Sequence, residues 1–230
     1  MAFSCNTVVP WGRSFDEYVR MFALTDKELA LKILGCGDGP ASFNAEMFWR
    51  GHRVVSCDPL YQFTSDQIEA RIAATYEDVM RQARENQANY NWTHIKSLEE
   101  LGRIRMTAMR TFLTDYDNGK ASGRYAIGEL PDLPFKPGSF DVALCSHFLF
   151  LYSNQLSLEF HYQAIEAMCR VAGEGRIFPL LTYNAEPSPF VEPVQELLIN
   201  AGYKVSIERV PYEFARGGNK MLRVRAVTRQ

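Results

Sequence analysis

The sequence predicts an α/β fold with a mostly parallel sheet that ends in an antiparallel hairpin. Short apolar runs, typical of buried parallel strands, alternate with segments whose apolar residues recur at helical spacing. The first run, over 31–34, leads into a glycine-rich turn and then into a helical pattern. Near the C-terminus, alternating apolar and polar residues flank Gly217 and Gly218, a pattern that indicates a hairpin.

The length and composition predict one domain with a full hydrophobic core. The chain has 230 residues and a mass of 26.3 kDa, with 47% hydrophobic and 23% charged residues. Its net charge of −2 does not indicate binding to nucleic acid or to an anionic membrane, which attract basic proteins. We therefore expect a small-molecule substrate, and the sequence leaves the oligomeric state open.

The cysteines and the N-terminus predict a cytoplasmic protein without a metal site. The N-terminus lacks the basic start and apolar run of a secretion signal, and the longest near-apolar stretch, 142–152, is too short to span a bilayer. The cysteines are odd in number and isolated, with no C-x-x-C pair and no histidine at metal-ligand spacing, and we expect them to be reduced core residues: Cys5, Cys36, Cys57, Cys145 and Cys169.

The chain is expected to begin with a loosely attached arm over 1–10, followed by a helix. Ser14 and Glu17 are the two ends of a capping box, which predicts a helix through about Leu24.

The turn after the first strand has the features of a nucleotide-binding loop. Gly35, Gly37 and Gly39 permit a sharp turn with no Cβ in the way of a ligand, and Pro40 suits the first position of a helix. Asp58 ends the next strand, where a carboxylate is placed to accept both hydroxyls of a ribose.

The glycine spacing and one acid distinguish between possible ligands. Dinucleotide folds have G-x-G-x-x-G, whereas this turn has G-x-G-x-G with Pro40 at the third-glycine position. Asp38 adds a negative charge inside the turn, which repels a pyrophosphate but not a ligand with a sulfonium and an ammonium group. The residues therefore favour S-adenosylmethionine over NAD as the cofactor.

The segment 33–39, I-L-G-C-G-D-G, together with Asp58 resembles the first two motifs of the class I S-adenosylmethionine-dependent methyltransferases. The resemblance implies a Rossmann-like seven-stranded methyltransferase sheet. One position departs from the family pattern, because members usually carry an acid where this sequence has Ile33. Either Asp38 compensates near the amino group of the cofactor, or it is a solvent-facing turn residue.

In the resembling family, a helix before the first strand often lies over the cofactor. The resemblance implies that Trp11 and Arg13 cover the methionine end, with Arg13 pairing the carboxylate of the cofactor. The alternative is an exposed arginine beside an anchoring tryptophan.

Two helical patterns precede the third strand and predict a helical insertion over 62–124. One helix begins after a cap at Thr64 and the other after a cap at Ser97, and Asn118-Gly119 is expected to turn the chain back. Insertions at this place commonly form a lid that recognises substrate. The mild basic bias of the segment either holds an anionic substrate or is a solvated helix face; it comes from Arg103, Arg105, Arg110, Lys120 and Arg124.

Two later stretches resemble the third and fourth motifs of the family. A short strand over 125–129 is followed by the sequence L-P-D-L-P-F, and the resemblance implies that Glu129 and Leu130 frame the adenine. A turn and Phe-Asp then open the apolar strand 140–147, which ends at the active site in the resembling family. Ser146, at that end, is expected to be a cofactor contact.

The remaining patterns complete the predicted sheet. Helices are expected over 158–172 and 194–201, a fifth strand over 176–181, and the hairpin between 203–208 and 222–226. The resemblance thus extends over about 29–228, with the insertion outside it.

His147 is the best-placed candidate for a general base, if the methyl acceptor must lose a proton. Tyr152 and Tyr183 are weaker candidates, and the alternative for His147 is a structural role, packed against Phe148 and hydrogen-bonded locally. The sequence lacks the Pro-Pro-aromatic motif of DNA-base and amide N-methyltransferases and the Pro-Cys arrangement used on cytosine.

Three interpretations follow from these patterns. The leading one is a methyltransferase acting on a small molecule, with an oxygen or a nitrogen as acceptor. The second is an NAD(P)-dependent oxidoreductase, against which Asp38, Pro40 and the terminal hairpin argue. The third is a non-catalytic S-adenosylmethionine-binding protein that uses the inserted helices as a docking surface.

Overall fold

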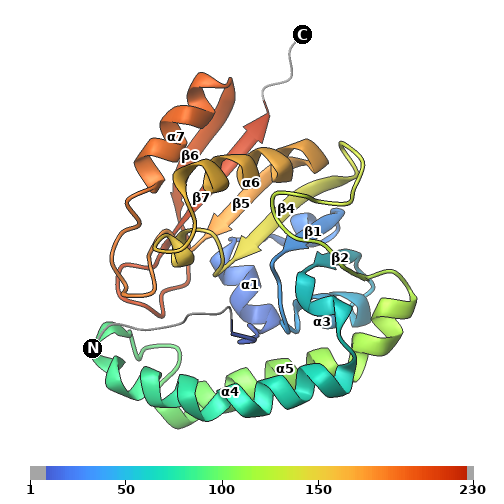
Figure 1. Cartoon of the computed structure of the whole chain (residues 1–230), viewed down its shortest axis with the longest axis vertical. Helices are drawn as coiled ribbons and strands as arrows, with labels where there is room; N and C mark the ends of the chain where they lie inside the picture. Colours follow the sequence, from blue (N-terminus) through green and yellow to red (C-terminus); the bar gives the residue numbers. More distant parts are fainter. Residues whose placement is uncertain (1–8, 227–230) are drawn as a thin grey trace.

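A computed structural model of the chain describes residues 9–226 and contains a seven-stranded mixed sheet with helices around it (Figure 1). The strands lie in the order β3-β2-β1-β4-β5-β7-β6. Neighbours among the first five are parallel, and β7 is antiparallel to both β5 and β6. This confirms the predicted mostly parallel sheet with a C-terminal antiparallel hairpin. The strands are β1 (Ile33–Cys36), β2 (Val54–Cys57), β3 (Tyr125–Ala126), β4 (Phe140–Ser146), β5 (Ala172–Phe178), β6 (Tyr203–Arg209) and β7 (Lys220–Ala226).

Helices cover both faces of the sheet, and the residues of β4 divide between them. Ala143 and Cys145 belong to a hydrophobic cluster with α6 and α7, whereas Val142 and Leu144 belong to a cluster with α1 and α3. This alternation follows from the period of two along a strand. The helices are α1 (Phe15–Met21), α2 (Asp26–Leu29), α3 (Phe43–Trp49), α4 (Ser65–Glu85), α5 (Leu98–Ala121), α6 (Leu158–Val171) and α7 (Val191–Asn200).

The two long helices predicted over 62–124 are α4 and α5, which run side by side along the bottom of Figure 1. The side chains of Thr64 and Ser97 cap them as expected. The turn expected at Asn118-Gly119 is wrong, because α5 continues through both residues. A Cβ on Gly119 would lie 2.3 Å from Cε2 of Tyr125, so this glycine lets α5 pack closely on β3.

Two elements are shorter than the sequence predicts. The first helix ends at Met21 and not near Leu24, since Ala23 has a φ of +47° that a helix cannot continue. The third strand pairs with β2 only through Tyr125 and Ala126. The expected arm lies outside the described residues up to position 8, as do Cys5 and Thr228, whereas the other four cysteines are buried and free.

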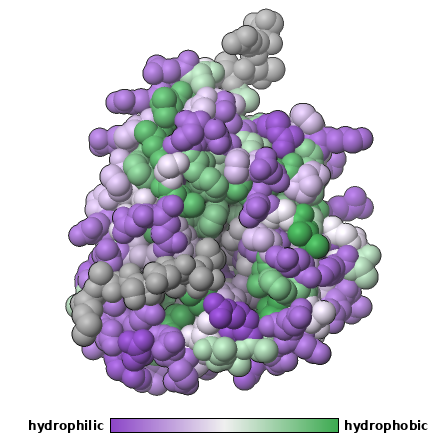
Figure 2. All heavy atoms as spheres, viewed as in Figure 1, coloured by the Kyte–Doolittle hydropathy of each residue, from purple (hydrophilic) through white to green (hydrophobic). Residues whose placement is uncertain are grey.

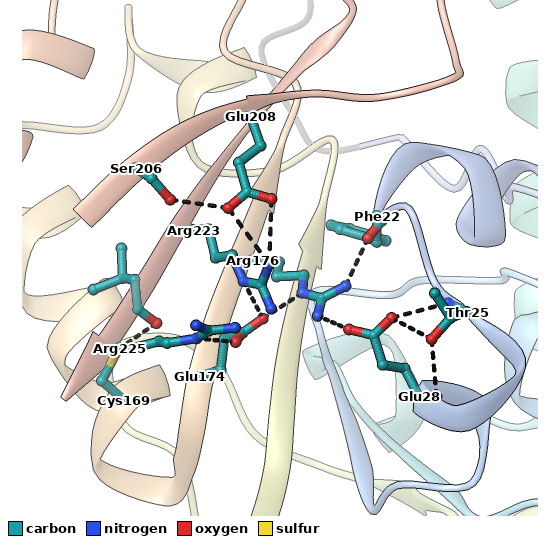
Figure 3. Close-up of polar contacts among 11 residues, drawn as sticks. Phe22, Thr25, Glu28, Cys169, Glu174, Arg176, Ser206, Glu208, Arg223 and Arg225 are labelled. Atoms are coloured by element: carbon teal, nitrogen blue, oxygen red, sulfur yellow. Dashed lines mark hydrogen bonds and ion pairs between the residues drawn. The ribbon is translucent and has the colours of Figure 1, made fainter. Parts of the chain in front are cut away.

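A buried arginine fastens the N-terminal segment to the sheet (Figure 3). Arg176 on β5 is 2% exposed, and its Nη1 donates to the carbonyl oxygen of Phe22 at 2.7 Å. Its Nε pairs with Glu174 at 2.5 Å, and its Nη2 pairs with Glu28 of α2. Glu174 also accepts from Arg223 of β7 at 2.7 Å. Because every charge in this network has an opposite partner, the network is compatible with burial.

Most of the face seen in Figure 2 is hydrophilic, with a hydrophobic area beside α6 and α7. Within residues 9–226, no helix combines the length and the apolar character needed to cross a membrane.

Candidate active site

A cavity of about 1000 Å³ lies at the carboxyl ends of the parallel strands. Its walls come from the residues that follow β1, β2, β4 and β5, from α4, and from the loop between β6 and β7. Ligands of open α/β sheets bind at this edge. All of the predicted site residues except Gly35 line the cavity: Arg13, Gly37, Asp38, Gly39, Asp58, Glu129, Leu130, Ser146 and His147.

The glycine turn has the conformation that its sequence requires. Gly37 and Gly39 have φ angles of +67° and +53°, in the left-handed region that favours glycine. Gly35 has a different role, because a Cβ at this position would lie 1.7 Å from Oδ2 of Asp38. Gly35 therefore leaves space for the Asp38 side chain and does not itself face the cavity.

Asp38 points inward and is not a solvent-facing turn residue. It is 7% exposed, and its carboxylate accepts hydrogen bonds from Tyr18 at 2.8 Å and from Ser56 at 2.6 Å. Burial raises the pKa of Asp38 to about 6, although both hydrogen bonds lower it, and the charge of Asp58 adds to the rise. The side chain thus carries a negative charge at neutral pH in a buried place beside the turn.

Asp58 joins the end of β2 to the glycine turn. Its Oδ2 accepts from the backbone N–H of Gly39 at 2.8 Å, and its Oδ1 accepts from that of Leu60 at 2.7 Å. Burial raises the pKa of Asp58 to about 6 against the effect of these two hydrogen bonds. Each carboxylate oxygen keeps a further lone pair, with which it can accept a ligand hydroxyl.

The segments after β2 and β3 border the cavity with apolar side chains and two acids. Leu60 comes from the short 3₁₀ helix Pro59–Gln62, and Leu130 comes from the loop between β3 and β4. Glu129 is exposed at this border, and Asp132 lies nearby in the same lining. Apolar side chains from two separate segments thus line this border.

His147 follows β4 directly and has a φ of +53°, which is unusual for a residue with a side chain. Its backbone N–H donates to the carbonyl oxygen of Phe178 at 2.7 Å, and Ser146 Oγ lies 2.9 Å from its Nδ1. Burial lowers the pKa of His147 well below its ordinary value, and the charges of Arg13 and Arg105 lower it further. The imidazole is therefore neutral at physiological pH. Its ring packs against the ring of Phe178, and its hydrogen bond with the adjacent Ser146 is the local one that the structural alternative expects.

Arg13 lies beside the glycine turn and faces the cavity. The backbone N–H of Ser42 donates to its carbonyl oxygen at 3.0 Å, and its own Nη1 donates to the carbonyl oxygen of Trp11 at 2.5 Å. Its Nε is buried and has no hydrogen-bond partner among residues 9–226. Burial lowers the pKa of Arg13, as does the charge of Arg105.

Arg105, which the sequence indicated only as part of a basic bias, forms another part of the wall and is held in a buried ion pair that the sequence did not predict. Arg105 on α5 donates from Nη1 and Nη2 to the two carboxylate oxygens of Glu17 on α1, at 2.5 and 2.7 Å. Tyr212 also donates to Glu17 at 2.7 Å. Burial raises the pKa of Glu17. The charge and the hydrogen bonds of Arg105 have a larger effect and hold this pKa well below its ordinary range. The signal for this role was the helical spacing, since Arg105 lies on the same face of α5 as Leu101 and Phe112.

The five basic residues noted between positions 103 and 124 have different surroundings in the structure. Arg105 lines the cavity, but the other four cations do not. Arg124 pairs with Asp115 at 2.7 Å, and Arg103 pairs with Glu100 at 3.4 Å. Of the five basic residues, Arg105 alone is therefore placed to contact a ligand in this cavity.

The segment between α4 and α5 is hydrogen-bonded to the loop between β6 and β7. The backbone N–H of Asn91 donates to the carbonyl oxygen of Phe214 at 2.6 Å, and that of Arg216 donates to Asn89 at 2.8 Å. The rings of Tyr90 and Phe214 stack with centroids 4.6 Å apart. Since both rings belong to residues of the cavity lining, the segment between α4 and α5 and the loop between β6 and β7 meet at the wall of the cavity.

Comparisons with known proteins agree with this architecture. No protein-family model matches the chain. It is 35% identical over 215 residues to uncharacterized protein MJ0045 of Methanocaldococcus jannaschii, which covers 93% of this chain and 94% of that protein. Among solved structures, magnesium protoporphyrin IX methyltransferase (ChlM) from Synechocystis PCC 6803 with bound SAH superposes with a TM-score of 0.51 and 12% identity, covering 93% of this chain and 81% of that one. The chain thus has the Rossmann-like class I methyltransferase fold.

Proposed function

The chain belongs to the same family as uncharacterized protein MJ0045 of Methanocaldococcus jannaschii, and on its class I methyltransferase fold we propose that it transfers a methyl group from S-adenosylmethionine to a small molecule. The observation that carries the proposal is the pair of acids at the glycine turn, the buried Asp38 and the half-buried Asp58. Asp38 and Asp58 bring two negative charges to one side of the cavity, which suits a ligand with a sulfonium and an ammonium group.

The residues of the cavity fit this cofactor at each of its ends. Asp58 would accept the ribose hydroxyls, and Glu129 and Leu130 would frame the adenine. Gly37 and Gly39 keep the turn free of side chains beside the ligand, since no heavy atom lies within 4 Å of a Cβ built on Gly39. The methionine end would meet three further lining residues, Asp38, Arg13 and Ser146. The carboxylate of the cofactor would pair with the guanidinium of Arg13.

S-adenosylmethionine, when bound, supplies a methyl group on a positively charged sulfur. The protein then has to align the acceptor, exclude water and, for a protonated acceptor, remove a proton. His147 is placed for the last task, because its Nδ1 is engaged with Ser146 and its ring is neutral. In this role Nδ1–H of His147 would donate to Ser146 Oγ, and the unprotonated Nε2 would take the proton from the acceptor.

The four buried, free cysteines among residues 9–226 and the net charge of −2 support a cytoplasmic enzyme that acts without nucleic acid or membrane.

Replacing the ribose carboxylate tests the proposal directly. The wild-type protein is expected to bind S-adenosylmethionine and S-adenosylhomocysteine in calorimetric titrations, and Asp58→Ala is expected to lose about 1.5 to 3 kcal/mol, roughly tenfold or more in affinity. Asp66→Ala, which removes an exposed acid of α4, is the control and should bind like the wild type. Tight binding of NADH with no binding of either sulfur ligand would instead support an oxidoreductase.

Acid is expected to weaken the binding of S-adenosylmethionine. The pKa values of Asp38 and Asp58 are raised to about 6, so both carboxylates become protonated as the pH falls through that value. Affinity that depends on the charged forms is present above pH 6 and lost below it, by about tenfold for each carboxylate between pH 7 and pH 5. Calorimetric titrations at these two pH values measure the loss, and equal affinities would contradict the assigned charges.

Acid has the opposite effect on the stability of the ligand-free protein: the raised pKa values of the two acids make the fold more stable as the pH falls. Ionisation of Asp38 and Asp58 opposes folding, and this opposition is relieved as the pH falls from about 6 toward the unfolded-state pKa of about 4.

A further inference from the structure

Strand β6 is the last strand of the sheet within residues 9–226, and its outer side has no strand beside it (Figure 1). It pairs with β7 along all of its length in one register, without a bulge or a proline. The opposite edge of the sheet is different, because β3 is only two residues long. Natural proteins commonly shorten, bend or interrupt a strand edge that must not pair with another chain. The long and regular edge of β6 is therefore a place where a further strand can be added.

One hydrogen bond shows which backbone groups of β6 face outward. The N–H of Val210 donates to the carbonyl oxygen of Asn219 at 3.0 Å, and these two residues continue the register of β6 and β7. In an antiparallel ladder, hydrogen-bonded pairs alternate with pairs that are not hydrogen-bonded. Ser206 and the other even-numbered residues of β6 thus bond to β7. The N–H and C=O groups that point away from β7 belong to Tyr203, Val205, Ile207 and Arg209.

We propose that β6 pairs antiparallel with β6 of a second copy of the chain, with Ser206 at the twofold axis, and so forms a symmetric dimer with one continuous sheet. This register pairs all seven residues of both strands. It also places the outward N–H groups of each copy opposite the outward C=O groups of the other. The inference does not depend on the proposed methyl-transfer function.

Charge complementarity selects this register. With Ser206 at the axis, Lys204 of each copy lies opposite Glu208 of the other. An axis at Val205 or at Ile207 would also align the backbone groups, but it would place Ser206 opposite one of the two charged residues. Opposite charges that face each other across a strand pair stabilise the pairing, and like charges weaken it.

A single copy of the chain leaves the charge of Lys204 unbalanced. Lys204 is exposed and lies opposite Arg225 in the register of β6 and β7, so two like charges are neighbours on one face of the sheet. Arg225 pairs with Glu174 (Figure 3), whereas Lys204 has no ion pair within residues 9–226. The side chain of Glu208 is 37% exposed, so its carboxylate is accessible to a second copy. Glu208 of the second copy would supply the acid that Lys204 lacks.

The other face of β6 would add apolar contacts to the dimer. Val205 packs against the hydrophobic cluster that contains Val194 and Leu198 of α7. Ile207 lies on the same face as Val205, because the side chains of a strand alternate, and it is 40% exposed. In the proposed register, Val205 of each copy lies opposite Ile207 of the other, and each pair removes apolar surface from water.

Sedimentation equilibrium at increasing protein concentration tests the dimer. The average mass should rise toward twice the 26.3 kDa of one chain and no further, because the edge at β3 is too short to pair in the same way. A mass that stays at that of one chain up to about 0.1 mM would overturn the proposal, because affinities of specific complexes lie below that concentration. Association beyond the dimer would also overturn it.

Two charge reversals test the register. Lys204→Glu places carboxylates opposite each other at two places in the dimer, and Glu208→Lys places ammonium groups there. Each variant alone should therefore dimerise at least about tenfold more weakly than the wild type. An equimolar mixture of the two variants should form a heterodimer with about the wild-type affinity, because every charge then faces its opposite. A mixture that associates no more tightly than either variant alone would contradict the pairing.

Lys136→Glu is the control for the change in net charge. Lys136 is exposed in the loop before β4, away from β6, so this variant should dimerise like the wild type. Lys204→Glu should keep the fold of the single chain, since it removes the like-charge contact with Arg225, and its thermal unfolding should show this. Equal dimerisation of Lys204→Glu and Lys136→Glu would show that β6 is not the interface.

Discussion

Arg105→Met is expected to lower the free energy of unfolding by about 3 to 5 kcal/mol, because it leaves the carboxylate of Glu17 buried without its counter-charge. Arg105 is 1% exposed and binds both oxygens of Glu17, which is itself 5% exposed. The pair joins α5 to α1, so its loss also loosens the wall of the cavity. Chemical denaturation followed by circular dichroism measures the change.

Two further variants separate the buried charge from other effects of the substitution. Arg103→Met breaks an exposed pair with Glu100 on the same helix and should cost less than about 1 kcal/mol. The double variant Glu17→Gln, Arg105→Met should recover a large part of the loss, since no unpaired charge then remains. A cost for Arg105→Met no greater than that for Arg103→Met would show that the pair does not support the fold.

Gly35→Ala is expected to disrupt the turn more than any other single methyl group added there. The new Cβ would lie 1.7 Å from Oδ2 and 2.3 Å from Cγ of Asp38, inside a buried strand end. The carboxylate must then leave its hydrogen bonds with Tyr18 and Ser56, and overpacking adds about 1 to 3 kcal/mol. We expect a loss of stability of this size and at least tenfold weaker binding of S-adenosylmethionine, as hydrogen bonds to charged groups contribute about 1.5 to 3 kcal/mol.

Gly173→Ala is the matched control for this substitution. Gly173 is also a strand glycine, but the nearest atom to its added Cβ is the carbonyl oxygen of Asp141 at 3.4 Å. Its stability should stay within about 1 kcal/mol of the wild type, with unchanged affinity for the cofactor. Equal behaviour of the two alanine variants would mean that the position of Asp38 is not fixed by Gly35.

The elements that the sequence predicts correctly depend on local patterns. The glycine turn, the caps at Thr64 and Ser97, and the terminal hairpin each follow from residues that are close together in the chain. Errors occur where a distant contact overrides such a pattern. The local pattern at Asn118-Gly119 indicates a turn, but Gly119 packs on Tyr125 and the helix continues through both residues.

Distant contacts determine the candidate site even more than the fold. That Asp58 ends a strand beside the turn is a local inference, and the structure brings it to the cavity. The inward position of Asp38 depends on Tyr18 and Ser56, and the burial of Arg105 depends on Glu17, which is 88 residues away in the sequence. A charged residue on a helix looks solvated until its partner is known, because burial of a charge requires that partner.

A crystal structure of the protein with S-adenosylhomocysteine would show whether this cavity binds the cofactor. We expect a ligand whose ribose hydroxyls contact the carboxylate of Asp58 and whose adenine lies between Leu60 and Leu130. Its amino acid end should reach Asp38 and Arg13. A ligand bound elsewhere, or a cavity that remains without S-adenosylhomocysteine at saturating concentration, would show that this is not the cofactor site.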